Sequence, residues 1–161
     1  MVSKITLAAI EYNKGDVRRI NHLLKVYAFA KTIAQAEKLD EKTQRIVELA
    51  AVLHDIGIHE SERKYGSSAG RYQELEGPPI ARKMLIENGA DDETTERVCF
   101  LIGRHHTYNA IDGIDFQILV EADFIVNIHE DKLSAEAASS VLKKHFKTIS
   151  GIAVLKNMYC V

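Results

Sequence analysis

Apolar residues recur at helical spacing along most of the chain. Between residues 16 and 39, Val26, Phe29 and Ile33 follow one another at steps of three and four residues, so they share one face of a helix. Asp16 can begin this helix, because a carboxylate at that position accepts hydrogen bonds from unpaired backbone N–H groups. Alternation of apolar and polar residues with period two is not sustained anywhere. The pattern therefore predicts an all-α protein.

Glycine, proline and polar residues set the expected helix ends. The second helix should end in the segment 54–57, where we expect Gly57 to adopt a left-handed conformation that stops it. Pro78 and Pro79 suit the first turn of a third helix. Between these helices, residues 59–75 are polar and contain several glycines and serines, which predicts a mobile loop with a short helical turn at most. The expected helices cover residues 16–39, 40–57, 77–87, 91–105, 116–130, 134–146 and 150–159.

Composition narrows the class of protein. The chain has 161 residues, of which 46% are hydrophobic and 27% are charged, values typical of one soluble domain with a full core. A formal net charge of −2 creates no basic field for nucleic acid or an anionic membrane. No apolar run approaches the roughly 18 residues that span a bilayer, and the apolar stretch at residues 5–10 is too short for a signal peptide. Cys99 and Cys160 form no disulfide framework, so we expect a cytoplasmic location.

Polar side chains stand where the helices should be apolar. His22 lies on the apolar stripe of its helix, His54 and Asp55 follow directly after a run of apolar residues, and Asp123 stands between two apolar triplets. Burying an unpaired carboxylate is costly, so a buried Asp is normally paired or coordinates a metal. Two His and two Asp residues in such settings suggest a shared cation. Imidazole nitrogen and carboxylate oxygen together suit Zn, Fe, Mn, Co or Ni.

The order of these residues resembles a known family. After His22 come Leu-His-Asp-Ile-Gly at 53–57, Glu-Gly-Pro-Pro-Ile-Ala at 76–81, Ile-Gly-Arg-His-His at 102–106 and Ala-Asp at 122–123. Over about residues 16–130, this set resembles the HD superfamily of metal-dependent phosphohydrolases. The resemblance implies a single HD-type domain over residues 1–161, a bundle of about six to seven helices around a metal site. Residue by residue, it implies the metal ligands His22, His54, Asp55 and Asp123.

Members of this superfamily that hold two metals use further histidines. His105 matches one of these positions, with His106 beside it. The position of the earlier extra histidine is held by Gln73. We therefore favour one divalent ion at the site, with His105 and His106 near it, and keep a second ion as the alternative.

Such a site predicts hydrolysis. The ion leaves coordination positions open for water and a phosphate oxygen, and it lowers the pKa of bound water from about 15.7 toward neutrality. We expect attack of this water on a small phosphoester, in particular a nucleotide. Asp55 is the candidate base, and His105 or His106, as imidazolium, would stabilise a phosphate or protonate the leaving oxygen.

Substrate phosphates also need cations. Lys25 lies one helical turn from His22, so it can face the same cavity, and we include it among the catalytic candidates. Arg71 and Arg104 are the other candidates for substrate binding.

Three alternatives remain open at this point. The domain could bind metal and nucleotide as a sensor without turnover. It could be a di-iron oxygenase of similar fold, although Gln73 in place of a histidine argues against that. Its buried His and Asp residues could also simply hydrogen-bond one another. The expected partners are a small phosphoester and, through an apolar helix face near the C-terminus, a second copy of the chain; neither a nucleic acid nor a membrane is expected.

Overall fold

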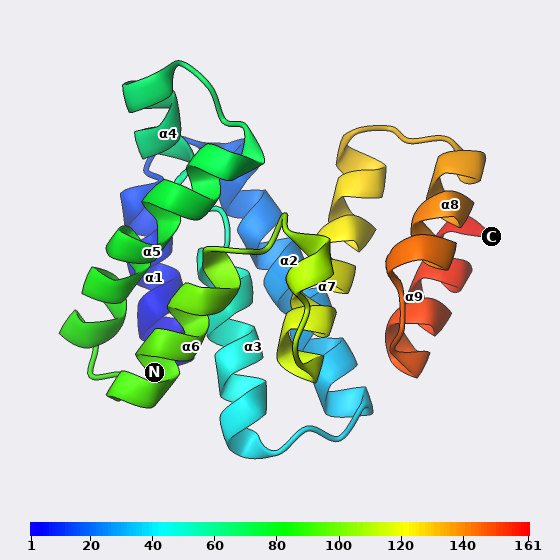
Figure 1. Ribbon diagram of the computed structural model, residues 1–161, viewed down its shortest axis with the longest axis horizontal. Coiled ribbons are helices and arrows are strands. Elements are labelled where there is room, and N and C mark those ends of the chain that lie inside the picture. Colours follow the sequence, from blue (N-terminus) through cyan, green and yellow to red (C-terminus); the bar gives the residue numbers. More distant parts are fainter.

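The computed structural model describes residues 1–161 as helices and connecting turns without any β-strand, which confirms the all-α prediction (Figure 1). A short 3₁₀ helix at Tyr108–Ala110 precedes α7, and the α-helices number nine rather than six to seven. Their bounds are α1 (Val2–Tyr12), α2 (Val17–Ala36), α3 (Glu41–Leu53), α4 (Ile58–Tyr65), α5 (Gly70–Glu87), α6 (Asp92–Ile102), α7 (Ile114–Glu130), α8 (Ala135–His145) and α9 (Ile149–Tyr159).

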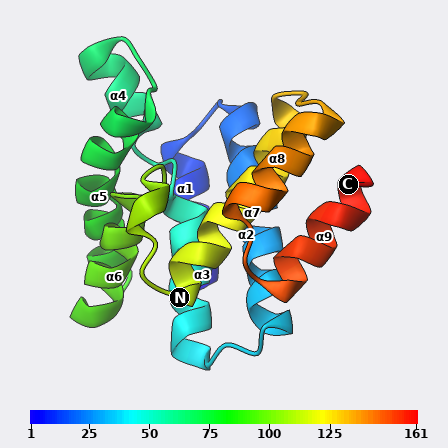
Figure 2. The same ribbon diagram turned by 45° about the vertical axis from the view of Figure 1, so that its right-hand side comes forward.

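Helix α7 forms the centre of the molecule. Almost every turn of it is buried, and its buried residues include Asp115, Gln117, Glu121 and Asp123 as well as apolar side chains. Helices α2 and α3 pack against it and against each other. The paired helices α5 and α6 cover one side of this group, and α8 and α9 cover the other (Figures 1 and 2). No helix is both long and apolar enough to cross a bilayer.

The predicted helix starts rest on side-chain caps. Asp16 accepts a hydrogen bond from the backbone N–H of Arg19 at 3.0 Å, and Asp91 accepts one from Thr94 at 2.8 Å. Asp40 caps α3 in the same way. Each cap accepts hydrogen bonds from N–H groups that have no partner inside the helix, and such a cap typically stabilises the fold by about 1 kcal/mol.

The segment predicted as a mobile loop is helical. Helix α4 occupies residues 58–65, and α5 begins at Gly70, so Pro78 and Pro79 lie inside α5 rather than at its start. Two polar residues in the first half of α5, Gln73 and Glu76, are buried and hydrogen-bonded. Gln73 donates to the carbonyl of Ser68 at 2.7 Å, and Glu76 accepts from α4. Other polar residues of the segment, such as Glu62, Arg63 and Arg71, are exposed, although they are part of helices rather than of a loop.

Gly57 has a different role from the one expected. Its φ of −78° is right-handed, so it does not stop α3 by a left-handed turn. A Cβ at this position would lie 2.6 Å from the backbone nitrogen of Gly77 and 2.8 Å from the carbonyl oxygen of Gln73. Gly57 is therefore needed for the close approach of α5 to the turn that follows α3.

The sequence pattern did not predict the N-terminal helix α1. Only Ile5 and Ala9, one turn apart, are buried on it, which is too short a periodic signal to predict a helix. They pack in the core, and α1 lies against α3.

A buried carboxylate ties α9 to α7. Glu121 accepts hydrogen bonds from the backbone N–H groups of Lys147 at 2.7 Å and Thr148 at 2.9 Å. These donors precede α9 and have no helical partner. On α9, Ile149 is 81% exposed and Met158 46%, so apolar side chains do reach the surface near the C-terminus. Whether a second copy covers them stays a prediction.

Candidate metal centre

Four side chains from α2, α7 and the end of α3 converge on one point. The Nε2 atoms of His22 and His54 lie 3.2 Å apart. Asp123 Oδ1 lies 3.3 Å from His22 Nε2 and 3.5 Å from His54 Nε2. Asp55 Oδ2 lies 3.5 Å from each of the same two nitrogens. The structure thus brings together all four residues that the resemblance implies as ligands.

The two histidines are oriented by bonds on their other ring nitrogen. His54 Nδ1 lies 2.8 Å from the carbonyl oxygen of Ala51, and His22 Nδ1 lies 3.0 Å from Glu130 Oε2. Carbonyl and carboxylate oxygens only accept, so each Nδ1 carries the hydrogen and donates it. Each Nε2 therefore directs its lone pair to the point of convergence, as metal-ligating histidines do.

This arrangement fits a divalent metal ion. Metal–ligand bonds of about 2.0–2.2 Å place neighbouring ligand atoms about 3.0–3.6 Å apart, depending on the coordination geometry, and the separations here are 3.2–3.5 Å. Two nitrogen lone pairs and two carboxylates in one buried cluster repel one another unless positive charge lies between them. The donor set of imidazole and carboxylate suits Mn, Fe, Co, Ni or Zn.

The pKa shifts in the cluster also favour positive charge at the point of convergence. Burial lowers the pKa of His22, but the hydrogen bond to Asp123 and the charge of Asp55 outweigh it and raise the pKa to about 9. Burial raises the pKa of Asp123, but hydrogen bonds to His22 and His54 hold it well below the usual range. A cation can replace the protons that the histidines would otherwise hold.

A second group of donors adjoins the first through Asp55. Its Oδ1 lies 3.5 Å from His105 Nε2. His105 Nδ1 donates to the carbonyl of Ile102 at 2.8 Å, so Nε2 again presents a lone pair, and it is buried with no hydrogen-bond partner. Ligand atoms of Asp55, His105 and His106 lie within 4.8 Å of one another. His105 therefore has the same orientation toward the site as His22 and His54.

His106 contacts Gln73, the residue at the position where two-metal members of the superfamily have a further histidine. Its Nε2 lies 3.1 Å from Gln73 Oε1, while the Gln73 amide nitrogen is bonded to Ser68. Burial and the neighbouring His105 lower the pKa of His106 to about 4. The lowered pKa favours the neutral form of His106 near pH 7; its role as an imidazolium stays a prediction.

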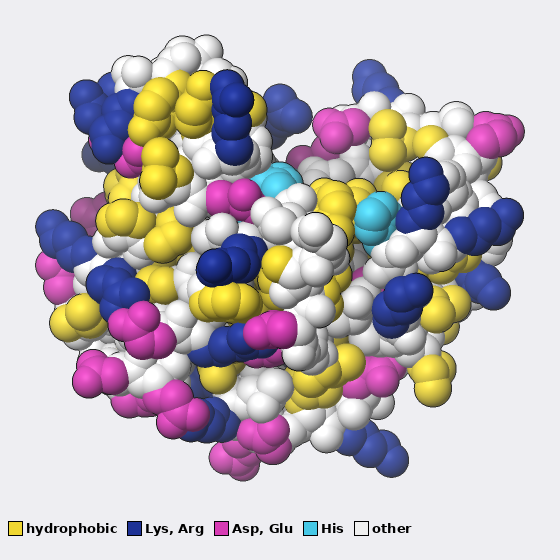
Figure 3. Space-filling model, viewed as in Figure 1, with side chains coloured by type: hydrophobic (Ala, Val, Ile, Leu, Met, Phe, Trp, Pro, Cys, Tyr) yellow, Lys and Arg dark blue, Asp and Glu magenta, His cyan; other side chains and the backbone are white.

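The cluster opens on a cavity of about 350 Å³. His22, Asp55 and Ser68 line it together with Arg18 and Arg19, and its position corresponds to the hollow between the α4–α5 side and the α7–α8 side in Figure 3. Arg19 is already paired with Asp16 and Glu62. Arg18 forms no ion pair, so it is the free cation at this cavity.

The cations expected from the sequence lie elsewhere. Lys25 is bonded to the outer oxygen of Glu130 and does not line the cavity at the ligands. Arg71 stacks over the ring of Tyr72, and Arg104 lies over the ring of Phe100. Neither arginine lines the cavity.

Several residues at the site were missed. Asn127 donates to Asp123 Oδ1 at 2.9 Å, and Glu130 orients His22. They follow Asp123 by four and seven residues, so helical spacing from a known ligand would have found them. Arg18 precedes His22 by four residues and follows from the same rule.

Removing the Glu130 carboxylate should weaken metal binding. In Glu130→Ala, His22 loses the acceptor that fixes its ring and tautomer, and we expect Mn²⁺ affinity to fall about 10-fold to 100-fold. Calorimetric titration of the metal-free protein measures this. Glu130→Gln keeps an acceptor oxygen and should lose less. Equal affinity in wild type and Glu130→Ala would show that Glu130 does not orient His22.

The comparisons with known proteins agree with this geometry. The sequence model of the HD domain family matches residues 19–143. No curated protein and no solved structure gives a significant match. The matched segment spans most of the chain and contains the four converging residues, so the chain belongs to the HD domain family.

Proposed function

We propose that this protein is a metal-dependent phosphohydrolase that acts on a small phosphoester, in particular a nucleotide. The observation that carries the proposal is the convergence of two imidazole nitrogens and two carboxylates beside a cavity with a free arginine. His22, His54, Asp55 and Asp123 would hold the ion, and membership of the HD domain family supports this assignment.

Each side chain has a definable part in such hydrolysis. The bound ion would supply charge neutralisation at phosphoryl oxygens and a lower pKa for water. Asp55 directs Oδ2 to His22 and His54 but Oδ1 to His105, so Oδ1 is left to take the proton of the attacking water. Arg18 at the cavity can bind a phosphate oxygen. The new bond would join the water oxygen to phosphorus as the ester P–O bond breaks, and the proton taken up by Asp55 would pass to the leaving oxygen, so that the alcohol is released neutral.

Metal content and turnover together test this proposal. Purified protein, loaded in turn with Mn, Co, Ni, Fe and Zn, is assayed for release of phosphate or pyrophosphate from nucleoside mono-, di- and triphosphates, and for release of the chromophore from a chromogenic phosphodiester. We expect a bound transition metal, and turnover that a chelator abolishes and added metal restores. Binding without turnover would indicate a sensor domain, and the absence of both would reject the site.

The cellular setting belongs to the same proposal. Cys99 and Cys160 are both free thiols, which suits a reducing compartment. We propose a cytoplasmic protein whose partner is a small phosphorylated molecule.

A further inference from the structure

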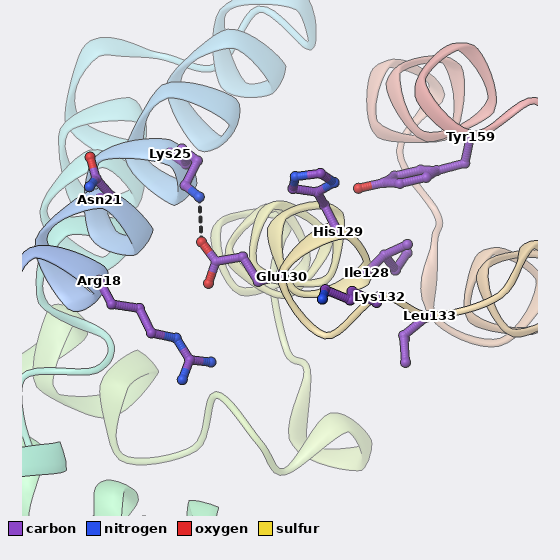
Figure 4. A pocket seen from close by; sticks show the side chains of 9 residues that line it. All are labelled: Arg18, Asn21, Lys25, Ile128, His129, Glu130, Lys132, Leu133 and Tyr159. Atoms are coloured by element: carbon purple, nitrogen blue, oxygen red, sulfur yellow. Dashed lines mark hydrogen bonds and ion pairs between the residues drawn. The ribbon is translucent and has the colours of Figure 1, made fainter.

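A second cavity of about 640 Å³ adjoins the cavity at the metal ligands. It lies between the start of α2 and the end of α7, and Arg18 and Glu130 line both cavities (Figure 4). We refer to it as the basic groove, because Arg18, Lys25 and Lys132 line it against the single carboxylate of Glu130.

Two of these three cations have no partner in the protein. Lys25 is paired with Glu130. Arg18 and Lys132 form neither an ion pair nor a side-chain hydrogen bond, and in Figure 4 they lie on two sides of Glu130. The groove therefore holds two uncompensated positive charges on a chain whose formal net charge is −2. An anion could bind there without displacing an existing ion pair.

The groove is joined to the metal ligands by one side chain. Glu130 accepts from His22 Nδ1 at 3.0 Å through Oε2 and binds Lys25 through Oε1. Only the Glu130 carboxylate thus separates the groove from a ligand of the metal site, and Arg18 reaches both spaces. One small molecule can extend from the metal ligands into the groove.

We propose that the basic groove binds a second phosphate group of the substrate, so that the preferred substrates carry at least two phosphates. This inference rests on the proposed phosphohydrolase function, which supplies the first phosphate at the metal ligands. Lys132 binds the second phosphate, and Arg18, which lines both cavities, lies between the two phosphates. The side chains of Ile128 and Leu133 add an apolar wall to the groove, which suits the remainder of an organic phosphate.

The test compares adenosine ligands that differ in the number and the position of their phosphates. Isothermal titration with adenosine 5′-monophosphate, adenosine diphosphate and adenosine 3′,5′-bisphosphate is run on Mn-loaded and on metal-free protein. We expect at least one ligand with two phosphates to bind about tenfold more tightly than the monophosphate. The diphosphate tests adjacent phosphates and the bisphosphate tests phosphates separated by a sugar, so the ligand that gains affinity identifies the arrangement.

A variant of Lys132 assigns the effect to the groove, because Lys132 lines the groove but not the cavity at the metal ligands. In Lys132→Ala, the advantage of the second phosphate should disappear, while affinity for the monophosphate changes less than twofold. The control Lys83→Ala removes the same charge from α5, outside the groove, and should keep the advantage. Both side chains are exposed, so circular dichroism should show unchanged folding.

Three outcomes would overturn the inference. In the first, the groove variant loses the same affinity for the monophosphate as for the ligands with two phosphates. In the second, the groove variant keeps the full affinity advantage of the second phosphate. In the third, the control variant loses that advantage as well. A failure of the proposed function is seen separately, as absence of Mn binding and of turnover in the wild type. In that case the titrations of metal-free protein still decide whether the groove binds a phosphate.

Discussion

Replacing Asp55 with Asn should lower phosphate release by about 10³-fold, because it removes both a metal ligand and the candidate base. Asn keeps the size of the side chain but loses the charge that faces His22, His54 and His105. Because Asp55 is not at the centre of the apolar core, the helical fold should be retained. Steady-state assays with Mn²⁺ on the most active substrate measure the loss, and circular dichroism checks the fold.

The comparison variant for this experiment is Asp92→Asn. Asp92 is exposed in the first turn of α6, away from the cluster. Its replacement by Asn changes the charge by the same amount as Asp55→Asn, so turnover should be unchanged. Metal content of Asp55→Asn, measured after dialysis, separates loss of the ion from loss of the base. Activity equal to wild type in Asp55→Asn would remove the mechanism proposed for this site.

The central helices could be predicted because their apolar stripes are long. Both α2 and α7 have apolar residues over four or more turns, and Asp16 and Gly113 stand at their starts. Helix α4 and the first turns of α5 could not be predicted in this way. Gln73 and Glu76 are polar yet buried, since partners from α4 and its following loop satisfy them. Local polarity cannot distinguish such paired residues from a solvated loop.

At the candidate site, the ligands could be predicted from the sequence, but the cations could not. His54, Asp55 and Asp123 stand at apolar helix positions, and this placement alone marks them as unusual. The cations have no such signal, because any exposed Lys or Arg fits a solvated surface. Lys25 was placed at the site by its spacing from His22, but Glu130, more than 100 residues away in the sequence, binds it on the far side. Only the packing of α7 against α2 shows this.

Replacing Gly57 with Ala should lower the free energy of unfolding by about 3 kcal/mol, the upper end of typical overpacking costs. The backbone of Gly57, with φ −78° and ψ −9°, is one that alanine adopts freely, so the expected effect is steric. Its Cβ would meet the backbone of Gly77 at 2.6 Å and of Gln73 at 2.8 Å. Backbone atoms cannot rotate away as a side chain would, so α5 must move as a unit. The melting temperature should fall by about 10 °C.

The matched control is Gly103→Ala, where the nearest atoms are 3.2 Å from the added Cβ and a loss of about 1 kcal/mol or less is expected. The two variants also differ in what they do to the site. Gly57 lies two residues after Asp55, and the displaced α5 carries Gln73, which holds His106. Gly57→Ala should therefore weaken Mn²⁺ binding as well as the fold, whereas Gly103→Ala should leave binding near the wild-type value. Denaturant unfolding and calorimetric titration measure the two effects, and equal stability of Gly57→Ala and wild type would contradict the close packing of α5 on this turn.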